Sequence, residues 1–445
     1  MEGGGNYIPK GLRMAADRLT TFSRNRFKVM PSGSDTSGPN QFSTFVLPSA
    51  SLIDLHSFKV HGDVLTTGAV GDNLVTVTGK LPGGGESLIN RFTVAANGQQ
   101  ISQGCQEYNS VSRVLKIGSC SRDRDLSTDR LLGFSTIDDT IGVDHVTMVW
   151  YEFLGLFSQA SVRYLDTSIL GSLQVQITWA GNEVLVARGN SDGVGGALNA
   201  DEEALVAANP IAYSIRNIYA TIDSISVDQL YGDLLRKRMS ESGYISLLMK
   251  EYYTFSMSGI NTTSANMRFA LSSGSIDKIY AVMRSDNYSA RNQDGYQVDG
   301  AVLNEALVAN YFKYPTFDSQ TELDGTLRYQ FVINGVAHPQ YQASVSDACF
   351  DLSYASNIAE TNSGHLVNSR TMFNDSFGVF TLLLNLPDEG MQCQTGLDSR
   401  SVSSQLELKF TGLNIPAGES ANCFVVASCT QEIRIGLGLS VAVAS

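Results

Sequence analysis

The chain has 445 residues, of which 43% are hydrophobic and 17% are charged, and its formal net charge is −13 at pH 7. Two domains of about 200 residues each fit this length. The acidic balance argues against broad nucleic-acid binding, which requires clustered lysine and arginine. The low charge content favours a turn-rich β-protein.

The N-terminal segment departs from this acidic average. Residues 1–30 contain six basic side chains against Glu2 and Asp17 only. We expect a basic N-terminal arm over residues 1–25. Its basic residues, counting the one that follows directly, are Lys10, Arg13, Arg18, Arg24 and Arg26. The alternative is a solubilising tail.

Residues 26–225 predict a first β-domain. Apolar and polar side chains alternate over 26–31 and 41–64, as in strands with one buried face. Asn97-Gly98 is the dipeptide most typical of two-residue hairpin turns. A near-continuous apolar run from Val146 to Leu156 predicts a strand buried on both faces.

Residues 226–243 differ in pattern and predict a linker between two domains. Leu230, Leu234 and Leu235 have helical spacing, and a basic triplet follows at 236–238. We attribute this triplet to the C-terminal end of a helix, where cations complement the dipole.

Residues 244–445 predict a second β-domain with the same plan. A long excursion over 284–328 includes a helical stretch near Val302 to Tyr311. The strand that follows ends at Asn334-Gly335, which predicts a second hairpin turn. A helix-and-loop segment reaches about 375, and alternating strands close the chain.

No motif for catalysis is present. The sequence lacks a G-x-S-x-G elbow, an H-E-x-x-H motif, a Walker loop and a complete G-x-G-x-x-G. Its six cysteines form no C-x-x-C pair, and no histidine stands at metal-ligand spacing from them. We therefore predict no catalytic, cofactor-binding or metal site, and a protein that is not an enzyme. The first residues lack the apolar core of a signal peptide, so we expect synthesis in the cytosol.

Three short patterns occur twice, in the same order in both halves. The second copy of each pattern follows the first after 224, 237 and 232 residues, counted from Phe45, Asn97 and Leu165. The pairs are Phe45–Asp54 with Phe269–Asp277, Phe92–Gly98 with Phe331–Gly335, and Leu165–Ile177 with Leu397–Phe410. Collinear matches with similar shifts indicate two copies of one domain, although two β-sandwiches also share alternation and Asn-Gly turns by convergence.

The predicted fold is all-β, with two tandem eight-stranded jelly rolls and short helices in the loops. The domains are residues 26–225 and 244–445. Two fused jelly rolls without a reactive constellation suit a tiling protein. Three copies present six roughly equivalent sides, which form a pseudo-hexagonal block.

A second hypothesis from the same residues is a two-module β-sandwich protein that binds or hydrolyses glycans. Such a protein presents exposed aromatic side chains on one face. Four tyrosines, Tyr288, Tyr296, Tyr311 and Tyr314, cluster near one predicted loop. No local pattern selects a pair of catalytic carboxylates, and the missing signal peptide counts against a secreted protein.

Several of these segments also resemble a known family. The run Phe45–Ser49 to Ser57–Val60, and the strands that end in Asn97-Gly98 and Asn334-Gly335, are similar to double jelly-roll major capsid proteins. The members they resemble are those of polinton-like viruses and virophages. The resemblance implies a structural major capsid protein of an icosahedral double-stranded DNA virus, located in the capsid shell of the virion. A minor vertex or spike protein of such a virus is a further alternative.

The resemblance also implies an orientation and partners. It implies homotrimeric capsomers, with loops such as 62–90, 187–210 and 284–328 forming outward towers. Neighbouring capsomers and minor capsid and penton proteins are the implied partners. The basic arm is implied to lie on the inner face, in contact with minor proteins, an inner membrane or the genome.

Overall fold

A computed structural model describes most of the chain. The described residues are 23–49, 51–70, 76–80, 85–119, 144–189, 204, 211–226, 229–286, 293–298, 301–319, 325–355, 370–386, 394–400, 405–436 and 440–444. All structural statements below concern these residues.

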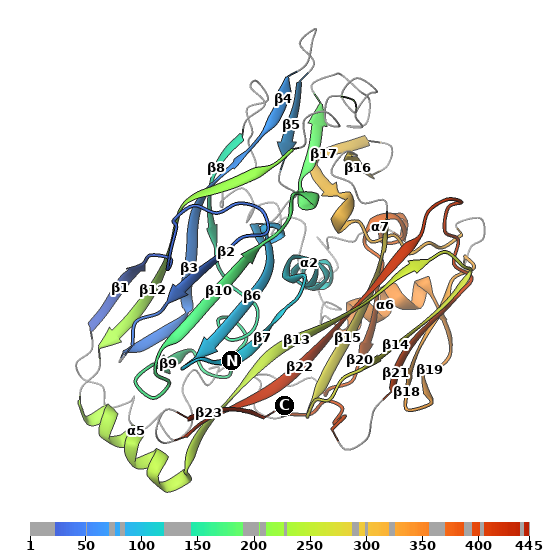
Figure 1. Ribbon diagram of the computed structural model, residues 1–445. Coiled ribbons are helices and arrows are strands. Elements are labelled where there is room, and N and C mark those ends of the chain that lie inside the picture. The colour runs from blue at the N-terminus through green and yellow to red at the C-terminus, as the bar shows by residue number, and fades with distance from the viewer. Residues whose placement is uncertain are drawn as a thin grey trace.

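The first half is built mainly on two antiparallel sheets (Figure 1). One has the order β1-β12-β3-β8, with β9 paired to β3; these strands span Ser23–Val29, Tyr213–Ser226, Leu52–Thr66, Asp144–Trp150 and Tyr164–Asp166. The other has the order β2-β10-β6-β7, with bounds Phe42–Val46, Leu173–Trp179, Ile89–Ala96 and Gln99–Cys105. Apolar side chains alternate inward along these strands, as in β10, where Leu173, Val175 and Ile177 are buried.

The second half has the same construction. One sheet has the order β13-β22-β15-β20, with β23 paired to β22; the bounds are Tyr244–Ile260, Ala421–Gly436, Ile276–Ser285, Val379–Leu383 and Ser440–Ala444. The other has the order β14-β21-β18-β19, with bounds Ser264–Ala270, Gln405–Thr411, Arg328–Ile333 and Val336–Ser344.

The two halves share one strand order. Each half has eight strands in the two sheet orders given above, and these eight can be numbered along the chain. Both halves then place strands 1-8-3-6 in one sheet and 2-7-4-5 in the other. This interleaving of the first and last strands is that of a jelly roll. The all-β fold with two tandem jelly rolls is thus confirmed, and the three repeated sequence patterns lie on equivalent strands and turns.

Helices occupy the connections. The helix α2 (Tyr108–Ser119) follows β7, and α6 (Val345–Ala355) follows β19, with α7 (Arg370–Ser376) before β20. The helix α5 (Gln229–Ser242) fills most of the segment interpreted as a linker. Because α5 continues to Ser242, the triplet at 236–238 lies within the helix, and its assignment to the last turn is wrong. Short 3-10 helices span Gly85–Leu88, Asn182–Val184 and Asn310–Phe312.

Further strands gather at one end of the molecule. The strands β4 (Gly68–Val70), β5 (Thr76–Lys80) and β11 (Val186–Gly189) form a small sheet, which contacts the hairpin of β16 (Gln293–Val298) and β17 (Ala301–Ala309). The helix predicted near Val302 to Tyr311 is therefore wrong. Its leucine spacing suits a helix, but antiparallel pairing with β16 decides the backbone conformation. We call this end, uppermost in Figure 1, the distal end.

At the opposite end, which we call the basal end, several strands of the larger sheet of each half begin or end. Ser23 pairs with Ser226, and Tyr244 pairs with Gly436, which also pairs with Ser440 of β23. The helix α5 joins β12 to β13 at this end (Figure 1).

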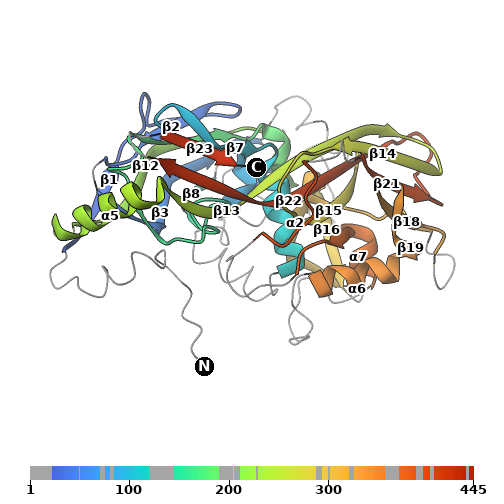
Figure 2. The ribbon, with the colours of Figure 1, turned by 90° about the horizontal axis from the view of Figure 1, so that it is seen from below.

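The halves share one hydrophobic core. A single cluster of buried side chains includes Phe58 and Trp179 of the first half and Tyr329 and Phe380 of the second. Backbone hydrogen bonds also join the halves, from Ser161 N–H to the Leu248 carbonyl at 2.7 Å and from Lys250 N–H to the Gln159 carbonyl at 3.1 Å. Figure 2 shows the halves side by side, with α2 between them.

Candidate functional site

The described residues offer little for chemistry. Within them, no group of three or more histidine, cysteine or acidic side chains is arranged to hold a metal ion. Burial raises the pKa of Cys423 and Cys429 to about 12, so both thiols stay protonated near neutral pH. In the same part of the chain, no helix has the length and apolarity needed to cross a bilayer. The functional candidates are therefore surfaces and the networks that hold them.

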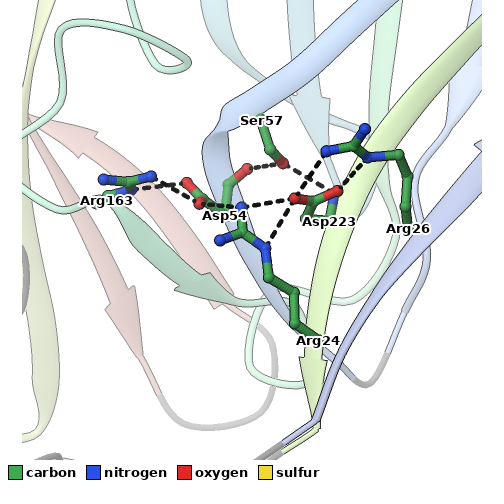
Figure 3. A network of polar contacts seen from close by, with 6 residues as sticks. All are labelled: Arg24, Arg26, Asp54, Ser57, Arg163 and Asp223. Carbon is green, nitrogen blue, oxygen red and sulfur yellow. Dashed lines mark hydrogen bonds and ion pairs between the residues drawn. The ribbon is translucent and has the colours of Figure 1, made fainter.

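The most connected polar network lies at the basal end of the first half (Figure 3). Asp54 on β3 has no exposed side-chain surface; its Oδ1 and Oδ2 each accept a hydrogen bond from Arg163 at 3.0 Å. Arg24 on β1 bridges to both acids, with Nη2 at 3.1 Å from Asp54 Oδ2 and Nε at 2.8 Å from Asp223 Oδ2. The network thus ties β1, β3, β12 and the segment before β9 together.

Asp223 on β12 receives a second arginine. Arg26 Nε donates to Asp223 Oδ1 at 2.7 Å, and Ser57 Oγ accepts from the Asp223 N–H at 2.8 Å. The hydrogen bond from Arg26, together with those from Arg24, holds the pKa of Asp223 below its usual range. The arginines thus compensate the negative charge of Asp223 at a place where it has little access to water.

The sequence-based assignment of Arg24 and Arg26 to an arm is wrong. Both residues lie on β1, which begins at Ser23 and pairs with β12 along its whole length. Their alternate positions place them on one face of the strand, where the acids of β3 and β12 lie. Lys10, Arg13 and Arg18 lie outside the described residues.

The second half has a related network at the equivalent place. Asp277 on β15 is buried, and its Oδ2 accepts hydrogen bonds from Lys250 Nζ on β13 at 2.6 Å and from Thr430 Oγ1 on β22 at 2.7 Å. Ser275 Oγ donates to Asp277 Oδ1 at 2.9 Å. An acid of the third strand is thus paired with a cation of the first strand in both halves, and the repeated pattern ending in Asp54 and Asp277 accounts for it.

The first and third repeated patterns contact each other in both halves. Thr167 Oγ1 accepts from the Ser51 N–H at 3.0 Å and lies 3.0 Å from the Pro48 carbonyl, to which it donates. Ser399 Oγ accepts from the Ser273 N–H at 2.9 Å and lies 2.7 Å from the Leu271 carbonyl. These hydroxyls hold the loop between the second and third strands.

The second repeated pattern forms hairpin turns. Asn97 and Gly98 connect β6 to β7 with φ of 49° and 79°, and Asn334 and Gly335 connect β18 to β19 with φ of 51° and 82°. Two successive positive φ angles define a type I′ turn, which matches the twist of the flanking strands.

The tyrosine cluster does not form an exposed platform among the described side chains. Tyr311 and Tyr314 are 7% and 1% exposed. Tyr288 and the side chain of Tyr296 lie outside what the structure describes. The observation that favoured glycan binding is therefore absent for the two described rings.

Exposed aromatic side chains occur elsewhere. Phe350 and Tyr354 on α6 are 69% and 56% exposed, and their rings stack with centroids 6.4 Å apart. The sequence analysis missed them. The buried stripe of α6, Val345, Ala348, Leu352 and Ala355, is a signal that could have found them, because both aromatics fall off that stripe.

The comparisons with known proteins show the fold. No family model matches the sequence, and no curated protein matches it significantly. Among solved structures, a chain of the PBCV-1 virus capsid matches at a TM-score of 0.60 with 15% identity, covering 96% of this chain and 98% of that one. The Faustovirus major capsid protein matches at 0.61 with 12% identity, over 94% and 91%. A chain of the Sputnik virophage structure matches at 0.51 with 13% identity, over 95% and 88%. The chain therefore has the fold of these capsid chains over nearly its whole length.

Proposed function

We propose that this protein is the structural major capsid protein of an icosahedral double-stranded DNA virus, which acts in the capsid shell of the virion and is not an enzyme. The observation that carries the proposal is the repeated strand order, 1-8-3-6 and 2-7-4-5 in each half, over one shared core. The matches to solved capsid chains extend over 88% or more of the length of those chains.

The polarity of the molecule supports an orientation in a shell. The loops of both halves gather at the distal end, and the chain ends of β1 and β23 lie at the basal end. We infer that the distal end faces outward and the basal end inward. The basic segment before β1, with Lys10, Arg13 and Arg18, then starts on the inner face, where minor capsid and penton proteins, an inner membrane or the genome are its proposed partners.

We further propose that three copies form one capsomer. Two equivalent jelly rolls in each chain give six similar units in a trimer, and such a pseudo-hexagonal block packs against like blocks. The core shared by the two halves supports the trimer, because it fixes the angle between the two jelly rolls of one chain.

Electron microscopy of the purified protein tests the proposal. We expect particles with three-fold symmetry and a six-lobed outline when seen along the axis from the distal to the basal end. Counting copies in purified virus particles separates a major capsid protein from a minor vertex or spike protein. Single two-lobed particles at all concentrations would contradict the trimer.

A further inference from the structure

The four-stranded sheet of each half, β2-β10-β6-β7 or β14-β21-β18-β19, buries one face in the core and turns the other outward. Figure 2 shows β2 and β14 on one side of the molecule and α6 and α7 on the opposite side. Because both halves have the same strand order, the two outer faces can be compared position by position.

Hydrogen bonds define which positions of the two outer faces are equivalent. In both halves the asparagine N–H of the hairpin turn donates to the carbonyl of the residue before a leucine, Leu173 or Leu406, at 2.8 and 3.1 Å. Gln174 and Glu407, which follow these leucines, are therefore equivalent. The equivalent outward pairs across the first two strands are Val46–Gln174 with Arg268–Glu407, Thr44–Gln176 with Asn266–Lys409, and Phe42–Thr178 with Ser264–Thr411.

The outer face of the first half is uncharged on these two strands. Neither β2 nor β10 contains a charged residue. Phe42 is 64% exposed and Val46 is 48% exposed, and both lie on β2. We call this surface the first lateral face; its residues are Phe42, Thr44, Val46, Gln174, Gln176 and Thr178.

The outer face of the second half carries charges at the same positions. Arg268 Nε lies 2.9 Å from Glu407 Oε1, and Lys409 Nζ lies 3.4 Å from Glu407 Oε2. We call this surface the second lateral face. The third strand does not distinguish the two faces, because Arg91 and Arg328 occupy equivalent positions on it.

The two lateral faces therefore differ in the cost of burial. Burying the second lateral face would remove three charged groups from water, whereas the first lateral face would bury an aromatic ring, an aliphatic side chain and neutral polar groups. Exposed aromatic residues without neighbouring charges are typical of the centres of protein interfaces. The net charge of −13 also makes copies of this chain repel one another, so they associate best through an uncharged surface.

We propose that the first lateral face binds the same face of a second copy in a neighbouring capsomer, while the second lateral face stays hydrated. In a layer of equally oriented pseudo-hexagonal capsomers, three capsomers meet at each corner, and the halves that meet there are of the same kind. First halves then meet first halves, as the uncharged face requires. This inference rests on the proposed function and assigns the cohesion between its capsomers to one of the two jelly rolls.

Point variants on the two lateral faces test the proposal. Light scattering follows the association of wild-type trimers, near three times 48.0 kDa, as the protein concentration rises in salt that screens their repulsion. F42D and V46D each place a carboxylate in the contact, so the concentration needed for association should rise by about tenfold or more. F42L keeps an apolar side chain and should associate like the wild type. S264D places the same charge at the position of the second lateral face equivalent to Phe42, and is the matched control.

The outcomes separate this inference from the proposed trimer. We expect all variants to remain trimeric and S264D to associate like the wild type. An equal loss of association in S264D and F42D would overturn the inference, and so would F42D and V46D that associate like the wild type. Wild-type trimers that do not associate at any salt concentration would overturn it as well, whereas a monomeric wild type would also overturn the proposed trimer.

Discussion

Thr167 and Ser399 make the same hydrogen bonds in the two halves of the chain. Each hydroxyl accepts from the N–H of a serine, Ser51 or Ser273, and lies within hydrogen-bonding distance of the carbonyl of that same serine. Both side chains are buried, with 0% and 2% exposure. Such a shared detail on equivalent loops favours duplication over convergence.

The first prediction concerns this hydroxyl. T167A leaves the half-buried Ser51 N–H without its acceptor, so the free energy of unfolding should fall by about 1–3 kcal/mol. S399A should have a similar effect through Ser273. Denaturant unfolding measures both, and T167S is the control that keeps the hydroxyl. Equal stability of T167A and T167S would show that the hydrogen bonds contribute nothing.

The second prediction concerns the buried acid of β3. D54N removes the charge that Arg24 and Arg163 share, and should lower the free energy of unfolding by about 2–3 kcal/mol. This loss is smaller than is usual for breaking a fully buried ion pair, because the Arg24 side chain is 47% exposed and water partly hydrates it. D398N is the matched control, since the Asp398–Arg400 pair is exposed at both ends and should contribute little to stability. A loss in D398N as large as that in D54N would contradict this account.

The third prediction is a dependence on pH. The pKa of Asp223 is lowered in the folded protein by Arg26 and Arg24, so its contribution to stability is fully present above the unfolded pKa of about 3.9. That contribution is lost as the pH falls through the lower folded value. The Tm difference between the wild type and D223N should therefore be large at pH 7 and shrink in acid. A difference that does not vary with pH would exclude the charge as its cause.

The fourth prediction concerns the hairpin turns. Gly98 and Gly335 have φ of 79° and 82°, and a Cβ at either position would meet no atom within 4 Å. G98A and G335A should therefore cost about 1–2 kcal/mol each through backbone strain alone. Gly38 has an ordinary φ, with its nearest neighbour 3.8 Å from an added Cβ, so G38A should be nearly neutral. Thermal unfolding compares the three, and a G98A variant as stable as G38A would contradict the turn assignment.

Local patterns predicted part of this structure, because they need no distant partner. Asn97-Gly98 and Asn334-Gly335 carry their turn geometry in two residues, and the alternation in β10 follows from one buried face. The three repeated sequence patterns occur in the same order in both halves because the two halves have the same order of strands.

Other features depend on contacts between residues far apart in the chain. Arg24 and Arg26 meet Asp223 across 199 and 197 residues, so their basic character alone suggested an arm. The backbone of β17 is decided by its pairing with β16, against a helical spacing of leucines.

The solution mass of the wild-type protein, measured by light scattering over a range of concentrations, tests the central claim most directly. The account predicts one species near three times 48.0 kDa that persists on dilution. A species near 48.0 kDa at every concentration would contradict a protein built as one third of a pseudo-hexagonal capsomer.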